Sequence, residues 1–126
     1  MNETGRVRVL IVDDQPLFVF ALRELLREDD RIDVIGTTDN AAHAIELATS
    51  EAIDVVLMDL TMPGMGGLEA TRTLKVTSPG TRVVVVTGHV GPEHEAAATA
   101  AGAVAFMRKG GLGVEVGDTV VRAAAG

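Results

Sequence analysis

Five short apolar runs, separated by segments with helical spacing, constrain this sequence more than any other feature. The runs are Val7–Val12, Ile32–Gly36, Ile53–Met58, Arg82–Val86 and Ala103–Met107. Each run has about the length of a strand and is rich in apolar residues without strict alternation. Such runs are typical of parallel strands that are covered on both faces.

The segments between these runs carry apolar residues at helical spacing. Pro16 and Pro92 stand where a first helical turn favours proline, and Asn40 is a favourable N-cap. The positions with helical spacing are Leu17, Ala21, Leu22, Leu25 and Leu26; Ala41, Ala44, Ile45 and Ala48; Leu68, Ala70, Thr71 and Leu74; the segment Glu93–Ala101; and Leu112, Val116, Val120 and Ala123 within Leu112–Ala125. Strands that alternate with helices predict an α/β fold of the (βα)5 type, a doubly wound parallel five-stranded sheet in the order 2-1-3-4-5.

Composition excludes several classes of function. The chain has 126 residues, enough for one domain, and its formal charge of −7 leaves no basic surplus for non-specific nucleic-acid binding. The absence of cysteine rules out disulfides and thiolate chemistry, and an aromatic content of 2% rules out a base-stacking platform. The apolar runs are too short for a signal peptide or a membrane span, so we expect a cytoplasmic protein without a membrane partner.

Polar residues with complementary chemistry follow four of the predicted strands. Asp13 and Asp14 follow the first, Asp59 the third, Thr87 the fourth and Lys109 the fifth. Ligand sites of such sheets lie at the carboxyl ends of the strands, where the first and third strands are neighbours. An aspartate after a strand, taken alone, is more often a turn former or a cap. Four such strand ends in one chain favour a functional site.

Three converging carboxylates repel one another and need a cation. Oxygen ligands with room for water suit Mg²⁺. A carboxylate can also attack phosphorus to give an aspartyl phosphate, with the metal and the lysine neutralising the transferred group. The residues therefore indicate a Mg²⁺-dependent phosphoryl-accepting site, with Asp59 as the nucleophile because of its central place.

The sequence closely resembles the receiver domain of response regulators in two-component signalling. The matching segments are Ile11–Pro16, Met58–Gly67, Val86–Gly88 and Gly102–Lys109. Their residue pattern is most similar to that of the NarL/FixJ class. The resemblance covers essentially the whole chain and implies the flavodoxin-like, CheY-like version of the fold. It also implies a single receiver domain over residues 1–126, with a C-terminal helix-turn-helix DNA-binding domain outside these residues.

The resemblance implies a role for each site residue. Asp59 would accept a phosphoryl group from a phosphohistidine of a sensor histidine kinase. Asp14 would bind Mg²⁺ directly, Asp13 would bind it through water, and the backbone carbonyl of Thr61 would be a further ligand. Lys109 would pair with the phosphoryl oxygens.

Two further residues would act as the switch. Thr87 would bind the phosphoryl group and shift inward, and Phe106 would turn inward behind it. This movement would repack the surface of the fourth helix, fifth strand and fifth helix. That surface, or the first and fifth helices, would also serve a homodimer.

Three departures from the family pattern stand near the end of the chain. Phe106 replaces the more usual tyrosine and cannot form a hydroxyl bond, and Gly110 replaces a proline that often follows the lysine. Whether the Lys109–Gly110 peptide is cis is left open. Glycines at 110, 111, 113 and 117 crowd the last helix, and an interior glycine costs about 1 kcal/mol relative to alanine. We therefore predict that this helix is weakly formed or begins late.

Other functions fit the residues less well. An aspartyl-phosphate phosphatase would carry a second acid two residues after the nucleophile, where this chain has Thr61, and a substrate cap for which there is no room. A flavodoxin-like carrier would need a Ser-, Thr- and Gly-rich loop where Asp13 and Asp14 stand. A degenerate receiver that acts only through protein contacts would not need the complete site. The domain is thus expected to be a switch, not an enzyme, that catalyses only its own phosphorylation and dephosphorylation.

The three histidines, at positions 43, 89 and 94, lack metal-ligand spacing, and His89 and His94, on either side of Pro92, are expected as loop residues facing solvent. His89, two residues after Thr87, is a candidate for controlling how water reaches the phosphoryl group.

Overall fold

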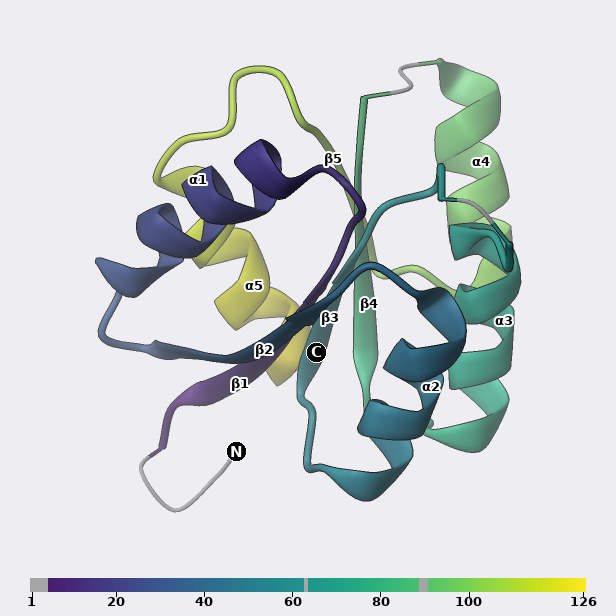
Figure 1. Ribbon diagram of the computed structural model, residues 1–126, viewed down its shortest axis with the longest axis horizontal. Coiled ribbons are helices and arrows are strands. Elements are labelled where there is room, and N and C mark those ends of the chain that lie inside the picture. The colour runs from purple at the N-terminus through teal and green to yellow at the C-terminus, as the bar shows by residue number, and fades with distance from the viewer. Residues whose placement is uncertain (1–4, 63, 89–90) are drawn as a thin grey trace.

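A computed structural model of the chain describes residues 5–62, 64–88 and 91–126. Five parallel strands form one sheet in the order β2-β1-β3-β4-β5, and helices connect them (Figure 1). The first and third strands are neighbours, as predicted. The reversal of strand order between them opens the crevice where ligands bind in such sheets.

The predicted strands are confirmed, with shifts of one or two residues at some ends. The observed strands are β1 (Val7–Val12), β2 (Ile32–Thr38), β3 (Val55–Met58), β4 (Arg82–Thr87) and β5 (Ala105–Arg108). β5 begins two residues later than its apolar run, because the Ala103 N–H still bonds the Ala98 carbonyl at the end of the preceding helix. The left-handed Gly102 (φ 115°) makes this turn possible.

The helices lie between the strands in the predicted places. They are α1 (Pro16–Arg27), α2 (Ala41–Ser50), α3 (Gly67–Thr77), α4 (Pro92–Ala101) and α5 (Glu115–Ala125). The Asn40 side chain caps α2 by accepting the His43 N–H at 3.0 Å, as its sequence predicts. α5 begins at Glu115 instead of Leu112, so the expectation of a late start is confirmed.

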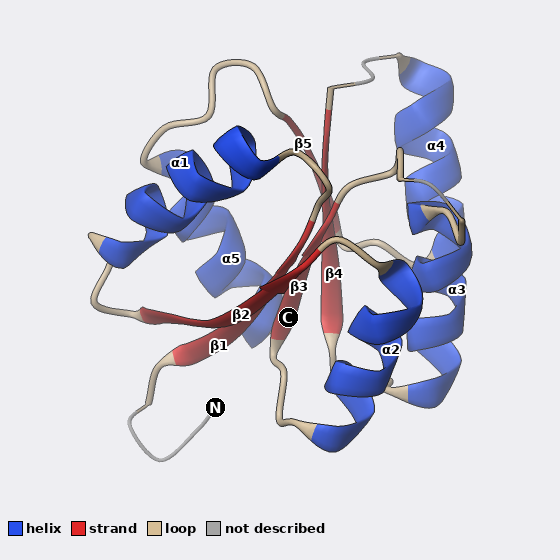
Figure 2. Cartoon of the chain, viewed as in Figure 1, coloured by secondary structure: helices blue, strands red, loops and turns tan. Residues whose placement is uncertain are grey.

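Two hydrophobic layers enclose the sheet, with α1 and α5 on one face and α2, α3 and α4 on the other (Figure 2). In β1, Val7, Val9 and Ile11 point to the first layer, and Leu10 and Val12 point to the second. Both faces of β1 are therefore buried, which explains why its residues 9–12 are apolar without a break.

The predicted apolar stripe of α1 is only partly correct. Leu22 and Leu26 are buried, but Leu17 is 86% exposed and Ala21 also faces solvent. The inward face of the helix is centred on Leu22 and Leu26, with Phe18 packed beside them. Leu17 and Ala21 fall on the opposite side of the 3.6-residue repeat.

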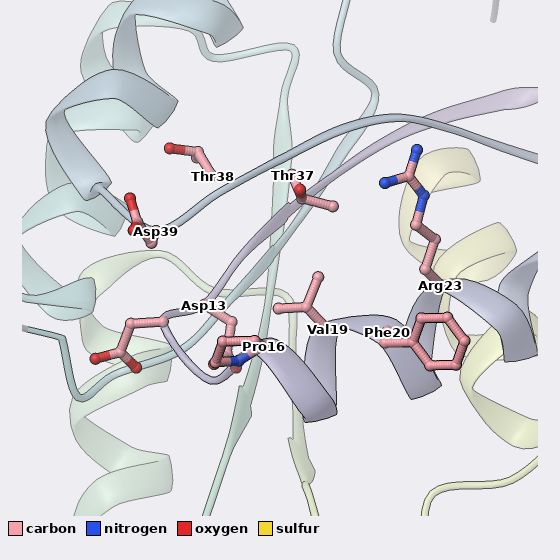
Figure 3. Close-up of a pocket in the computed structure, with 9 residues that line it drawn as sticks. Asp13, Pro16, Val19, Phe20, Arg23, Thr37, Thr38 and Asp39 are labelled. Carbon is pink, nitrogen blue, oxygen red and sulfur yellow. The ribbon is translucent and has the colours of Figure 1, made fainter.

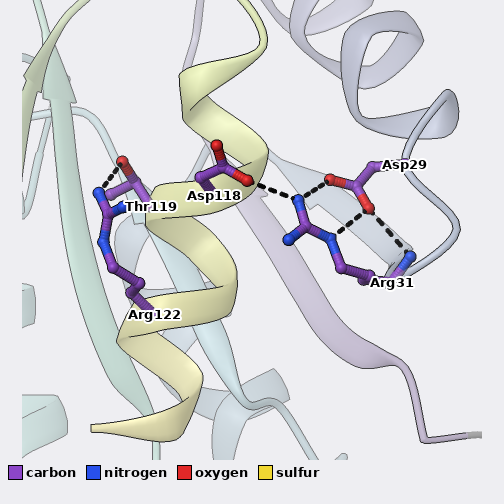
Figure 4. A network of polar contacts seen from close by, with 5 residues as sticks. All are labelled: Asp29, Arg31, Asp118, Thr119 and Arg122. Carbon is purple, nitrogen blue, oxygen red and sulfur yellow. Dashed lines mark hydrogen bonds and ion pairs between the residues drawn. The ribbon is translucent and has the colours of Figure 1, made fainter.

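A polar network fastens α5 to the turn between α1 and β2 (Figure 4). The Arg31 guanidinium donates two hydrogen bonds to the Asp29 carboxylate, at 2.9 and 2.7 Å, and a third to Asp118 of α5 at 2.8 Å. A Cβ atom at Gly117 would lie 2.4 Å from Asp29 Oδ2, so this glycine allows the carboxylate to reach α5. The Arg31 bonds thus bring a charged contact to the glycine-rich part of α5.

No helix in the described parts of the chain combines the length and the hydrophobicity that crossing a bilayer requires.

Candidate functional site

Asp13, Asp14 and Asp59 lie together where β1 and β3 end. Asp13 follows β1 and Asp59 follows β3, and the Asp59 N–H donates to the Val12 carbonyl at 2.9 Å, which keeps the two strand ends side by side. Carboxylate oxygens of the three residues lie within 4.8 Å of one another. Asp13 and Asp59 are buried, Asp59 with 1% of its surface exposed, whereas Asp14 is exposed. The three carboxylates therefore converge as the sequence predicted.

Lys109 completes this cluster from the end of β5. Its Nζ atom lies 2.8 Å from Asp13 Oδ2 and 3.5 Å from Asp59 Oδ2. Its backbone N–H donates to the Thr87 carbonyl at 2.9 Å, so the ends of β4 and β5 are joined at this point. One positive charge thus faces two buried negative charges.

The Asp59 carboxyl lies in surroundings that disfavour its charge. Burial raises its pKa above the ordinary value, and the negative charge of Asp13 raises the pKa further. The Thr61 backbone N–H and the Lys109 ammonium act in the opposite direction but do not cancel the rise in pKa. A further cation at the site would therefore stabilise the carboxylate.

The loop after β3 wraps around the Asp59 side chain. The Thr61 N–H donates to Asp59 Oδ1 at 3.3 Å, and the Thr61 hydroxyl lies 3.4 Å from the same oxygen. The first residue of α3, Gly67, packs against the loop so closely that a Cβ atom there would lie 2.2 Å from the Asp59 carbonyl oxygen. Gly67 therefore has a packing role at the start of α3.

Thr87 and Phe106 occupy neighbouring strands beside the carboxylates. Thr87, the last residue of β4, is fully buried. Phe106 in β5 pairs with Val85 of β4, and its half-buried ring packs against the core layer under α2, α3 and α4. Both residues thus lie on the strands that lead from the site to the α4–β5 side of the molecule. The described residues contain no cis peptide, so the bond between Lys109 and Gly110 is trans.

Two residues at the site were not predicted from the sequence. Gln15 Oε1 accepts a hydrogen bond from Lys109 Nζ at 2.6 Å, and the Phe18 ring centroid lies 4.7 Å from the same nitrogen. Gln15 belongs to a segment with family resemblance, but neither its type nor its spacing indicates that its side chain turns toward a lysine 94 residues away. Phe18 occupies a helical position in α1 that is equally consistent with core packing, so the sequence does not indicate its contact with Lys109.

A cavity of about 520 Å³ opens beside Asp13 and Asp14, between α1 and the end of β2 (Figure 3). Pro16, Val19, Phe20 and Arg23 line it from α1, and Thr37, Thr38 and Asp39 line it from the other side. Space for water and for a small phosphoryl donor is therefore available next to the carboxylates.

The two histidines that the structure describes, His43 and His94, take no part in the carboxylate cluster. His43 lies in the first turn of α2, where its Nδ1 is 3.1 Å from the Thr38 hydroxyl, and His94 lies in the first turn of α4. His43 thus lies in the helix predicted after Asn40, whereas the prediction of a loop position is wrong for His94, because Pro92 begins a helix just before it. His89, with its suggested effect on water, lies outside the described residues.

The donor set of the cluster fits a hard divalent cation. Carboxylate oxygens from three residues are close enough to share one ion, and one of the three residues is open to water. Mg²⁺ favours this combination of a few carboxylates with retained water molecules. The cluster could therefore hold Mg²⁺, and the ion would offset the negative charge that burial and Asp13 disfavour on Asp59.

Comparison with known proteins identifies the family. The family model described as the response regulator receiver domain matches residues 9–113. The chain is 36% identical to the response regulator UvrY of Escherichia coli (strain K12), over 87% of this chain and 50% of UvrY, and 39% identical to the response regulator GacA of Pseudomonas viridiflava, over 82% and 49%. The signal receiver domain of NarL from Mycobacterium tuberculosis superposes with a TM-score of 0.92 at 32% identity, covering 97% of this chain and 98% of that one. The chain spans about half the length of these curated relatives and belongs to the response regulator receiver domain family.

Proposed function

We propose that this domain is a signalling switch that accepts a phosphoryl group on the Asp59 carboxylate. The observation that carries the proposal is the place of Asp59: it is buried, it is central among three converging carboxylates, and a lysine ammonium lies 3.5 Å away. A carboxylate with cationic groups around it is suited to in-line attack on phosphorus.

The proposed step transfers the phosphoryl group from a phosphohistidine of a sensor histidine kinase. An Asp59 carboxylate oxygen forms the new oxygen–phosphorus bond while the phosphorus–nitrogen bond breaks, and the imidazole leaves with its electron pair and takes up a proton. Water later cleaves the acyl phosphate, which returns Asp59 and inorganic phosphate. The domain thus catalyses only its own phosphorylation and dephosphorylation.

Three residues are proposed to hold Mg²⁺ together with Asp59. Asp14 would bind the ion directly, in keeping with its exposure, Asp13 would bind it through water, and the Thr61 carbonyl would be a further ligand. When bound, the ion would offset negative charge on the carboxylates and on the phosphoryl oxygens.

Lys109, Thr87 and Phe106 are proposed to read the phosphoryl group. The Lys109 ammonium would pair with phosphoryl oxygens, and the Thr87 hydroxyl would donate a hydrogen bond to them. Phe106 would turn behind Thr87 and repack the α4–β5–α5 surface. A new charge at Asp59 would bias this two-state element by offering both donors a charged phosphoryl acceptor.

The output is proposed to be control of transcription through a C-terminal helix-turn-helix domain that lies outside these 126 residues. The similarity to UvrY and GacA, whose length is about twice the matched part, supports this proposal. A homodimer through the α4–β5–α5 surface, or through α1 and α5, would couple the switch to DNA. A stand-alone receiver that acts through protein contacts is the alternative.

Incubation with Mg²⁺ and acetyl phosphate tests the proposed function. We expect the intact mass of the wild-type domain to increase by one phosphoryl group, and we expect no increase for Asp59→Asn or in the presence of a chelator. Equal labelling of the wild type and Asp59→Asn would contradict the proposal.

A further inference from the structure

The Lys109 ammonium is held by three acceptors that differ in kind. Its Nζ atom lies 2.6 Å from the Gln15 amide oxygen, 2.8 Å from Asp13 Oδ2 and 3.5 Å from Asp59 Oδ2. An ammonium has three N–H donors, so these oxygens account for all of them. The shortest of the three contacts is made to the neutral residue and not to a carboxylate.

The Gln15 backbone is fixed where its side chain can reach the lysine. Gln15 is the N-cap of α1 and precedes Pro16, which restricts it to an extended conformation, here φ −99° and ψ 101°. Its N–H donates to Asp13 Oδ1 at 2.9 Å, while the other Asp13 oxygen receives Lys109. Asp13, Gln15 and Lys109 therefore form a closed ring of hydrogen bonds. The Gln15 side chain does not cap the helix; its oxygen is directed to Lys109.

The three acceptors would not have the same fate in the proposed reaction. A cation at the cluster would compete with Lys109 for Asp13, and a phosphoryl group would replace the free oxygen of Asp59. The Gln15 amide carries no charge and is not part of the carboxylate cluster, so neither event removes it as a partner. The Phe18 ring, 4.7 Å from Nζ, adds a second neutral contact to the ammonium.

We infer that Gln15 is a positioning residue for Lys109. It keeps the Lys109 ammonium beside Asp59 when a cation weakens the contact between Lys109 and Asp13, so that the ammonium is available to the incoming phosphoryl group. This inference rests on the proposed function of Asp59. A lysine side chain without such a partner keeps rotamer freedom that favours other positions. Gln15 is exposed, so replacing it should not disturb the core.

The test compares Gln15→Met with the wild type, since methionine has a similar length but lacks the amide oxygen. The rate of phosphorylation by acetyl phosphate is measured at saturating Mg²⁺, and Mg²⁺ affinity is measured separately by calorimetric titration. We expect the rate to fall about fivefold, as for loss of a partly exposed hydrogen bond to a charged group, and the Mg²⁺ dissociation constant to change less than twofold. Leu17→Met, on the exposed side of α1, is the matched control and should keep the wild-type rate.

A second comparison shows whether Gln15 acts through the lysine. In a Lys109→Met background, where phosphorylation is already slow, Gln15→Met should cause no further loss. An unchanged rate in the single variant, a further fivefold loss in the Lys109→Met background, or a parallel loss of Mg²⁺ affinity would overturn the inference. A wild-type domain that gives no Asp59-dependent adduct would instead overturn the proposed function, and the inference would fall with it.

Discussion

At the scale of single residues, Asp59 combines burial with a charge that its surroundings disfavour. Its pKa is raised mainly by burial and then by Asp13. Between the ordinary aspartate pKa of 3.8 and the higher value in the folded protein, the folded state binds more protons than the unfolded state. The free energy of unfolding therefore falls as pH rises through this interval, and the loss is complete once the pH is well above the raised pKa.

The first prediction is that Asp59→Asn raises the free energy of unfolding at pH 7 in the absence of divalent cations. The neutral amide avoids both the burial of a charge and the repulsion from Asp13, and the gain should shrink as pH is lowered through the same interval. Urea unfolding of both proteins across this pH range measures it. Mg²⁺ should stabilise the wild type and not the variant; a variant less stable than the wild type at pH 7 would show that Lys109 outweighs burial.

The second prediction concerns the contact between α3 and the loop after β3. Gly67→Ala should lower the free energy of unfolding by about 1–3 kcal/mol, because its Cβ would meet the backbone of Asp59 and Leu60 at 2.2 and 2.8 Å. Gly80→Ala is the matched control, since no atom lies within 4 Å of a Cβ there, and its stability should stay within about 1 kcal/mol of the wild type. Equal effects of the two substitutions in urea unfolding would contradict the packing argument.

The cluster of carboxylates and lysine could be predicted from the sequence because each of these residues directly follows a strand. Asp13, Asp59 and Lys109 stand where the chain leaves the sheet, so topology alone brings them together. The contact of Gln15 with Lys109 depends on a side-chain rotamer, and no periodicity encodes it. The exposure of Leu17 likewise depends on which side of α1 meets the sheet.

At the scale of elements, α5 has a contact that its own sequence does not suggest. Propensity alone treats Gly117 as a weak point, and substitution by alanine should then add about 1 kcal/mol. The structure explains this glycine, because the Asp29 carboxylate lies against it while Arg31, bonded to Asp29, also donates to Asp118 of α5 (Figure 4). The late start of the helix was predictable from its glycines, but this contact from another part of the chain was not.

The third prediction separates these two effects. Gly117→Ala in the wild type should bring no stabilisation, because the new Cβ displaces the Asp29 carboxylate from its place beside α5. In an Asp29→Ala background the same substitution should stabilise the protein by about 1 kcal/mol relative to Asp29→Ala alone. Thermal or urea unfolding of the four proteins measures the cycle. A full gain from Gly117→Ala in the wild type would mean that the carboxylate moves without cost.

At the scale of the whole molecule, the sheet places Asp59, the proposed acceptor, at the end of β3 and the proposed output surface beyond β4. Thr87, fully buried, ends β4 between the two, and Phe106, half-buried, lies on β5 at the proposed surface. The order of the strands was predictable from the apolar runs, because few topologies suit five alternating strands and helices. The movement that would follow phosphorylation depends on a second packing arrangement, which a strand pattern does not encode.

The fourth prediction is that Thr87→Ala separates phosphoryl binding from the response of the output surface. With Mg²⁺ and beryllofluoride, the wild type should show amide chemical-shift changes at the site and across β5 and α5. In Thr87→Ala the changes at Asp59 should remain, while those in β5 and α5 should become smaller. Thr87→Ser keeps the hydroxyl and serves as the control. Equal shifts in β5 and α5 for all three proteins would remove Thr87 from the coupling.

The central claim, that Asp59 is the phosphoryl acceptor, is tested most directly by finding the residue that carries the group. After incubation with Mg²⁺ and acetyl phosphate, borohydride reduces an aspartyl phosphate to homoserine, and peptide mass spectrometry gives its position. We predict homoserine at position 59 alone, formed with Mg²⁺ and absent with a chelator. Homoserine at position 13, 14 or 54, or none anywhere in a domain that remains folded, would contradict the account.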